Sequence, residues 1–73
     1  MSLYDEIANL SKPYLGPAAG QFIARQCTVY LNIKPENLGK PHLRELAKWV
    51  ETSGARLMDS AKATDLAWKI AKL

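Results

Sequence analysis

The sequence predicts a small all-α protein, an orthogonal or irregular bundle of four helices that forms a single helical domain over residues 1–73. Apolar residues recur every three or four positions along most of the chain, and no segment shows the strict alternation of a strand. Glycine and proline stand mainly where helices would begin or end. Between Pro13 and Ile33 the only charged residue is Arg25. Because a surface helix needs a solvated polar face, we expect the helix in this stretch to be the central one, covered by protein on most sides.

The first helix is expected at about residues 2–11. Ser2 and Asp5 have the spacing of a capping box, in which each side chain binds the other's backbone N–H. Pro13 is expected to end this segment, because proline has no N–H and disfavours the helical conformation of the residue before it. The apolar residues at helical spacing are Leu3, Ile7, Leu10 and Tyr14.

The second helix is expected at about residues 17–31. Pro17 follows Gly16, and proline is favoured at the first position of a helix. With Ile23 at the centre of the buried face, only a narrow strip around Arg25 is expected to be solvated. The residues on or beside the buried face are Ala19, Phe22, Ala24, Gln26, Cys27, Tyr30 and Leu31.

The third helix is expected at about residues 41–58, after a connection rich in turn formers that includes a short 3₁₀ turn near Pro35. Its apolar stripe continues through Gly54, so we interpret this glycine as a mid-helix residue that another helix approaches closely. The alternative is a left-handed C-cap at Gly54, which would permit a helix-turn-helix despite a poor match to that motif. The stripe consists of Leu43, Leu46, Ala47, Val50, Gly54 and Leu57.

The fourth helix is expected at about residues 60–72, with Asp59 or Ser60 as its N-cap. Trp68 lies about 160° from the centre of its apolar face and is therefore expected to point toward solvent. The face itself consists of Ala63, Leu66, Ala67, Ile70 and Leu73.

The chain length makes the core marginal. A chain of 73 residues buries a smaller share of its surface than larger domains do. One cysteine and one histidine provide neither an internal disulfide nor a structural zinc site. Stability is therefore expected to come from helix packing or from oligomerisation. The lone cysteine and the lack of a signal peptide or a long apolar run predict a cytoplasmic protein without a membrane span.

The two tryptophans are the predicted interface residues. Tryptophan is enriched among residues that dominate binding energy at protein interfaces. An exposed Trp68 would suit contact with a partner, whereas the alternative is packing within the chain. Trp49 lies at the edge of the third helix, where packing against a neighbouring helix is the favoured interpretation.

A basic stripe supports a second hypothesis. Residues 1–39 carry no net charge, and residues 40–73 carry +3. Phosphate contacts made by such a stripe would bind nucleic acid, although acidic residues dilute it and a solvated helix face is the ordinary explanation. The residues concerned are Lys40, Arg44, Lys48, Lys62 and Lys69.

No constellation of catalytic residues is found, so the chain is not expected to be an enzyme. His42 has no carboxylate or nucleophile at a suggestive spacing, and Cys27 is expected in the core, where thiols are inert. Arg25, as a lone charge on an apolar helix, is expected to form a salt bridge with an acidic residue. No motif indicates a metal, a cofactor or a small-molecule ligand.

The segment that begins at Tyr14 resembles the opening of short helical modules attached to some bacterial regulatory proteins. It reads Tyr-Leu-Gly-Pro-Ala-Ala and is followed by Phe22, Ile23 and Arg25. The resemblance covers residues 14–31 and implies an interaction or regulatory module without catalytic activity. Glycine and proline before an apolar helix are also ordinary capping chemistry.

Taken with the composition, these features predict a non-catalytic protein-interaction or regulatory module. Its partner would be another protein or a second copy of the chain in a homodimer. The alternative is a small basic nucleic-acid-binding protein that uses the C-terminal half.

Overall fold

The computed structural model describes residues 2–73, and it is all-α over that range. Four α-helical segments follow one another along the chain, and no strand occurs among the described residues. Turns of 3₁₀ or π type lie between α1 and α3, and a short irregular turn joins α3 to α4. The predicted all-α class is therefore confirmed, whereas the predicted bundle of four regular helices is not. The helices are α1 (Leu3–Leu15), α2 (Ala19–Arg25), α3 (Leu43–Gly54) and α4 (Ser60–Ala71).

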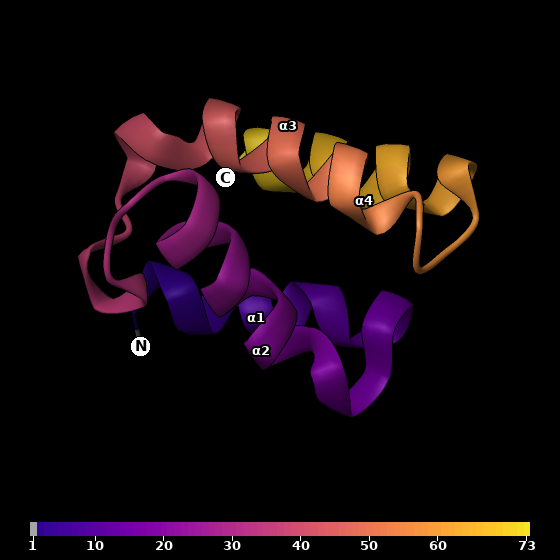
Figure 1. The fold of residues 1–73 in the computed structure, drawn as a ribbon, viewed down its shortest axis with the longest axis horizontal. Helices are drawn as coiled ribbons and strands as arrows, with labels where there is room; N and C mark the ends of the chain where they lie inside the picture. The colour runs from indigo at the N-terminus through magenta and orange to yellow at the C-terminus, as the bar shows by residue number, and fades with distance from the viewer. Residues whose placement is uncertain (1) are drawn as a thin grey trace.

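The helices form two layers, each a helical hairpin (Figure 1). In one layer α1 packs against α2, and in the other α3 packs against α4 along its length. The layers meet where α1 contacts α4 and where the turn after α2 contacts α3. The side-by-side packing of α3 and α4 differs from the steep crossing of a helix-turn-helix.

Only three of the predicted helices are regular, with 12 or 13 residues each. The predicted helix over residues 17–31 is instead composite. It consists of the 3₁₀ turn η1 (Gly16–Ala18), the seven-residue α2 and the π-helical turn η2 (Gln26–Tyr30). The Thr28 hydroxyl donates to the Ala24 carbonyl at 3.1 Å, and the Leu31 N–H donates to the Gln26 carbonyl at 3.2 Å. The Leu31 bond is the five-residue backbone bond of a π turn, and the Thr28 bond is a local side-chain bond of the kind that competes with the helical ladder.

The predicted central position of this segment is wrong. Ile23 and Cys27 are fully buried, as expected, but Val29 is 57% exposed and Tyr30 is 39% exposed. The composite helix lies in an outer layer, so one side of it faces solvent (Figure 1). The absence of charge between Pro13 and Ile33 therefore marks an uncharged outer surface in addition to a buried face.

The first helix begins as predicted and ends later. The capping box is present, because the Asp5 N–H donates to Ser2 Oγ at 3.1 Å and the Ser2 N–H reaches the Asp5 carboxylate. Pro13 lies inside α1 and does not end it. Gly16, with φ of 65°, closes the helix by donating its N–H to the Lys12 carbonyl. Pro13 provides no N–H for the carbonyl of Asn9, so α1 lacks that one backbone bond and still continues to Leu15.

The third helix is shorter than predicted at both ends. Residues Lys40–His42 form a 3₁₀ turn, and α3 ends at Gly54 instead of residue 58. The N–H groups of Leu57 and Met58 both donate to the Gly54 carbonyl, which turns the chain toward α4. Leu57, predicted on the buried stripe, is 66% exposed as a result.

Gly54 is buried but is not a left-handed cap, because its φ is not positive. A Cβ at this position would lie 3.4 Å from the Ala63 Cβ and 3.2 Å from the Met58 Cε. The predicted close approach of a neighbouring helix is therefore confirmed, although the helix ends there.

The core is a single apolar cluster to which both hairpins contribute. The predicted faces of α3 and α4 are buried apart from Leu57 and Leu73, and Asp59 is the N-cap of α4. Leu38 also folds back onto the cluster from the connection that contains the 3₁₀ turn Pro35–Asn37. The fully buried members of the cluster are Ile7, Ile23, Cys27, Leu46, Val50, Leu66 and Ile70.

A polar network joins the end of α1 to α4. The Tyr14 hydroxyl donates to the Asp65 carboxylate and accepts from Lys69 Nζ at 2.6 Å. Lys69 also forms a salt bridge with Asp65 at 3.3 Å. The hydrogen bonds from Tyr14 and Lys69 lower the pKa of Asp65, and those with Tyr14 and Asp65 raise the pKa of Lys69.

Tyr14→Phe should lower the free energy of unfolding at neutral pH, because it removes the hydroxyl at the centre of this network. A carboxyl group whose pKa is lowered by folding stabilises the native state above its unfolded pKa, and this contribution is lost as the pH falls through the folded pKa. The difference between Tyr14→Phe and the wild type should therefore shrink in acid. Urea unfolding at neutral pH and near pH 2 (about two units below the ordinary pKa of Asp) measures it.

Tyr4→Phe is the matched control for this experiment. The Tyr4 hydroxyl donates to the Gly20 carbonyl at 2.8 Å, a bond that involves no titrating acceptor. Its loss should cost a similar amount at both pH values. A pH-independent effect of Tyr14→Phe would contradict the proposed coupling to Asp65.

Gly54→Ala should change the free energy of unfolding by less than about 1 kcal/mol. The gain in helix propensity is of that size at most, and the nearest contact is the flexible end of Met58, which can move. Gly54→Asn should destabilise by about 1–3 kcal/mol, since it buries an amide without a partner. Thermal melts of the two variants test this ranking. A more stable asparagine variant would indicate a left-handed conformation at residue 54.

Candidate functional site

Trp68 is the most exposed aromatic side chain among residues 2–73, with 61% of its surface accessible. It lies on the solvent side of α4, as the helical spacing predicted. Lys72 Nζ lies 3.7 Å from the centroid of its ring. This cation–π contact covers part of the ring and adds a positive charge next to it.

A shallow groove of about 260 Å³ runs between α3 and α4 beside Trp68. We call it the Trp68 groove. Small side chains contribute to its lining, and basic side chains stand at its α3 side. Glu51 is the one acidic residue in it, and its carboxylate accepts a hydrogen bond from Thr64 at 2.8 Å. The remaining lining residues are Arg44, Ala47, Lys48, Ala67 and Ala71.

The five predicted nucleic-acid contacts do not form one surface. Arg44 and Lys48 lie beside Trp68 in the groove, and Lys40 belongs to the turn that precedes α3. Lys69 instead faces α1 and is held by Tyr14 and Asp65. Lys62 lies two helical turns before Lys69 and hence on the same side of α4. The predicted basic residues therefore do not lie together. Arg44 and Lys48 lie on one flank of α4, and Lys62 and Lys69 lie on the other.

Trp49 lies on the other flank of α3, away from Trp68. Its ring stacks on Tyr30, with ring centroids 4.3 Å apart and planes inclined by 15°. The expectation that Trp49 packs against a neighbouring helix is confirmed by this contact with η2. Trp49 Nε1 is buried and has no hydrogen-bond partner within the described residues.

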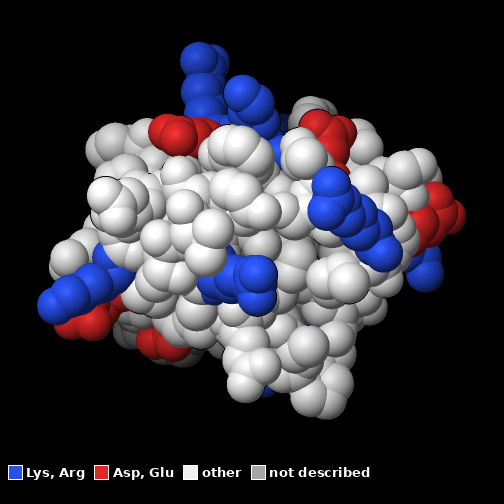
Figure 2. Space-filling model, viewed as in Figure 1, with Lys and Arg blue, Asp and Glu red and all other residues white. Residues whose placement is uncertain are grey.

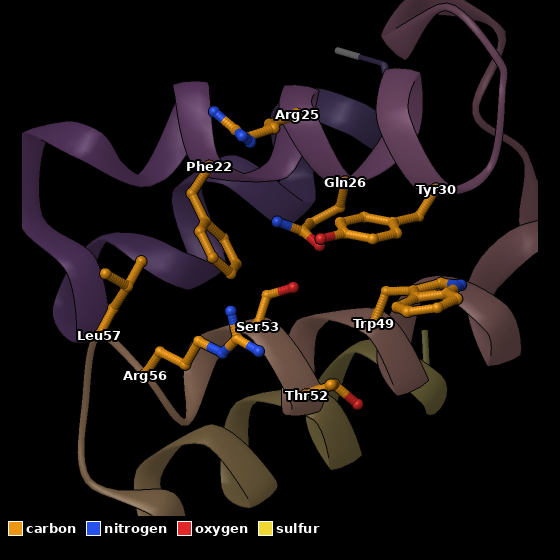
Figure 3. Close-up of a pocket in the computed structure, with 9 residues that line it drawn as sticks. All are labelled: Phe22, Arg25, Gln26, Tyr30, Trp49, Thr52, Ser53, Arg56 and Leu57. Carbon is orange, nitrogen blue, oxygen red and sulfur yellow. The ribbon is translucent and has the colours of Figure 1, made fainter.

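A deeper cleft of about 450 Å³ lies between the two layers, and Trp49 lines it. Side chains from α2 and η2 form one wall, and side chains from α3 and the turn after it form the other (Figure 3). We call it the interlayer cleft. Its other lining residues are Phe22, Arg25, Gln26, Tyr30, Thr52, Ser53, Arg56 and Leu57.

Gln26 lines this cleft, although nothing in the sequence indicated a functional role for it. Its side chain points from the composite helix toward α3 (Figure 3). The residue is only 1% exposed, and its Oε1 has no hydrogen-bond partner. A buried polar atom without a partner is uncommon in folded proteins. Its position beside the buried face was predicted, but its missing partner depends on tertiary contacts.

The cleft is lined by two arginines and no acidic residue. Within residues 2–73, the one ion pair joins Lys69 to Asp65. The expected salt bridge of Arg25 is therefore wrong: Arg25 is exposed, because the composite helix has a solvated side. The face with α2 and α3 in front carries large uncharged areas, with separate basic and acidic side chains (Figure 2).

The surroundings of Cys27 and His42 are those of residues that support the fold, in the core and in a turn respectively. Cys27 is fully buried, and burial raises the pKa of its thiol. His42 Nδ1 accepts a hydrogen bond from the Gly39 N–H at 3.0 Å, which closes the turn before α3. Among the described residues, no three His, Cys, Asp or Glu side chains are grouped closely enough to hold a metal ion.

Comparisons of the chain with protein-family models, curated proteins and solved structures gave no match. No helix within residues 2–73 has both the length and the apolar character that crossing a membrane requires. The Trp68 groove and the interlayer cleft are the two candidate sites. These two sites share no lining residue and lie on opposite flanks of α3.

The Cys27 thiol should react with a thiol-specific reagent at least about tenfold more slowly in the native protein than in denaturant, because the reactive thiolate is disfavoured by burial. A colorimetric disulfide reagent at mildly alkaline pH measures both rates. The denatured chain is the internal control, since Cys27 is the only cysteine. Equal rates in the two states would show that this helix face opens readily.

Proposed function

We propose that the chain is a non-catalytic protein-interaction module that binds an acidic, apolar segment of another protein at the Trp68 groove. The observation that carries this proposal is the exposure of Trp68 at the edge of a groove with small side chains. A tryptophan has a large apolar area to bury, and exposed apolar patches commonly mark interaction sites. Packing within the chain does not account for its position, because 61% of its surface is accessible.

The charge around the groove determines the class of partner. Arg44 and Lys48 line the groove, and Lys72 lies on the Trp68 ring. Only Glu51 offsets them. A partner with acidic side chains around an apolar residue complements this arrangement, since complementary potentials favour association.

Self-association, which the chain length suggested, is less well supported at this groove. A symmetric dimer places the same patch on both sides of its interface. Two copies of Arg44, Lys48 and Lys72 would then face each other, and like charges are repelled. Sedimentation velocity measures the oligomeric state directly.

Nucleic-acid binding is the second candidate, and the proximity of Trp68 to Arg44 and Lys48 favours it. Proteins that bind single strands combine aromatic stacking with basic side chains. The groove is a weaker match, because Lys72 already occupies part of the Trp68 ring and Lys69 is paired with Asp65. Such binding would weaken steeply with salt.

Trp68→Ala should weaken the binding of a fluorescent peptide with alternating acidic and leucine residues by about 30-fold or more, which corresponds to about 2 kcal/mol. Fluorescence anisotropy measures the dissociation constant. The same peptide with lysine in place of each acid should not bind. The variant should stay within about 0.5 kcal/mol of wild-type stability, as is usual for surface positions.

Lys62→Gln is the matched control, because Lys62 is a basic residue of α4 outside the groove. It should leave peptide affinity nearly unchanged. Equal binding by Trp68→Ala and the wild type would contradict the proposed groove. Tighter binding of a single-stranded oligonucleotide than of the acidic peptide would favour the second candidate.

A further inference from the structure

We propose that the interlayer cleft binds a small planar organic acid, an aromatic carboxylate that also carries a hydrogen-bond donor. This site is separate from the Trp68 groove, and the inference does not depend on the function proposed there. Its volume of about 450 Å³ lies in the range of small-molecule pockets, and such pockets combine apolar walls with a few placed polar groups.

The walls of the cleft suit a flat ring. The Phe22 side chain points into the cleft from the composite helix, and the stacked Tyr30–Trp49 pair lies further along it (Figure 3). Aromatic rings pack favourably against other rings in offset or edge-on arrangements. An aromatic ligand between Phe22 and Tyr30 would bury its faces against both.

The unpaired amide of Gln26 requires a donor. Gln26 Oε1 has no partner within the described residues, and the side chain lies between the two walls of the cleft. Leaving such a buried acceptor without a hydrogen bond is unfavourable. Because this oxygen is itself fully buried, the amide would turn toward the cleft to accept a hydrogen bond from a hydroxyl or N–H group on the ligand, which would remove that penalty.

The opposite wall provides an anion site. Arg56 has no carboxylate within 4.0 Å in the described chain, and its guanidinium group lies beside Ser53 at this wall (Figure 3). Within residues 2–73 the Ser53 hydroxyl also forms no hydrogen bond, whereas Thr52 Oγ1 donates to the Lys48 carbonyl. Arginine binds carboxylates through two parallel hydrogen bonds. A ligand carboxylate at Arg56 and Ser53 would accept hydrogen bonds from both side chains.

The lining residues argue against other ligand classes. A metal ion needs acidic or histidine side chains, and the cleft has none. Aromatic rings can attract an organic cation, but Arg25 and Arg56 in the lining would repel it. An inorganic anion alone would leave the aromatic walls and the Gln26 acceptor without contacts. A ligand with a ring between its donor and its carboxylate would contact the aromatic walls, the Gln26 acceptor and the anion site at Arg56.

Three naphthalene derivatives test the proposal. The first is a hydroxynaphthoate with its two groups at opposite ends of the ring system, the second is the naphthoate without the hydroxyl, and the third is the naphthol without the carboxylate. Calorimetry should show saturable binding of the hydroxynaphthoate below about 1 mM. The other two should bind at least about fivefold more weakly. In NMR titrations the indole signal of Trp49 should shift, and that of Trp68 should not.

Two substitutions assign the roles. Arg56→Gln should reduce the affinity for both acids at least about tenfold, a charge-assisted contact being lost, and should leave naphthol binding unchanged. Gln26→Leu should remove the preference for hydroxynaphthoate over naphthoate. Arg44→Gln, an arginine variant on the opposite flank of α3, is the control and should bind all three probes like the wild type.

The proposal is overturned if neither acid binds saturably, if Arg56→Gln binds the acids as well as Arg44→Gln does, or if Trp68 reports the binding. Gln26→Met is the second variant at that position should Gln26→Leu fail to fold. Acidic-peptide binding tests the Trp68 groove separately, so failure at one site is distinguishable from failure at the other.

Discussion

The two helical hairpins depend on one shared apolar core. Neither hairpin encloses its own apolar face, and residues from both layers meet in a single cluster that includes Ile7, Ile23 and Leu46. With one cysteine and no grouped metal ligands in the described chain, no covalent or metal cross-link supplements this contact. The polar contacts between the layers, such as Tyr14 with Asp65, lie at the exposed edge of the core.

The same arrangement produces the two candidate sites. Where α3 and α4 pack closely, small side chains such as Ala47 and Ala67 leave only a shallow surface groove. Where η2 meets α3, larger side chains hold the layers apart, and the interlayer cleft remains between them. One helix, α3, thus contributes a different flank to each site.

The elements that could be predicted from the sequence are those governed by local chemistry. The Ser2 capping box, the Asp59 N-cap and the apolar face of α4 depend on spacing along one helix. Such spacing also placed Trp68 toward solvent. The later end of α1, which Gly16 closes, and the earlier end of α3, which two N–H bonds to the Gly54 carbonyl accompany, depend on backbone geometry that periodicity does not reveal.

The candidate cleft could not be predicted for a similar reason. Gln26 was placed beside the buried face, but whether its amide finds a partner depends on residues that are distant in sequence. Arg56 was placed inside a helix, and its position at the cleft follows from the turn after Gly54. The uncharged stretch around Arg25 was interpreted as buried because lack of charge does not distinguish a core helix from an uncharged surface.

The π-helical turn at Gln26–Tyr30 has a consequence for the register of the chain. A π turn holds one residue more than an α turn, so the side chains at its end point in other directions than they would in an uninterrupted α-helix. Tyr30, the last residue of this turn, is the one that stacks on Trp49. The turn therefore contains one residue more than a regular helix needs. A chain shortened by one residue here could form a regular helix, but it would present a different side chain to Trp49.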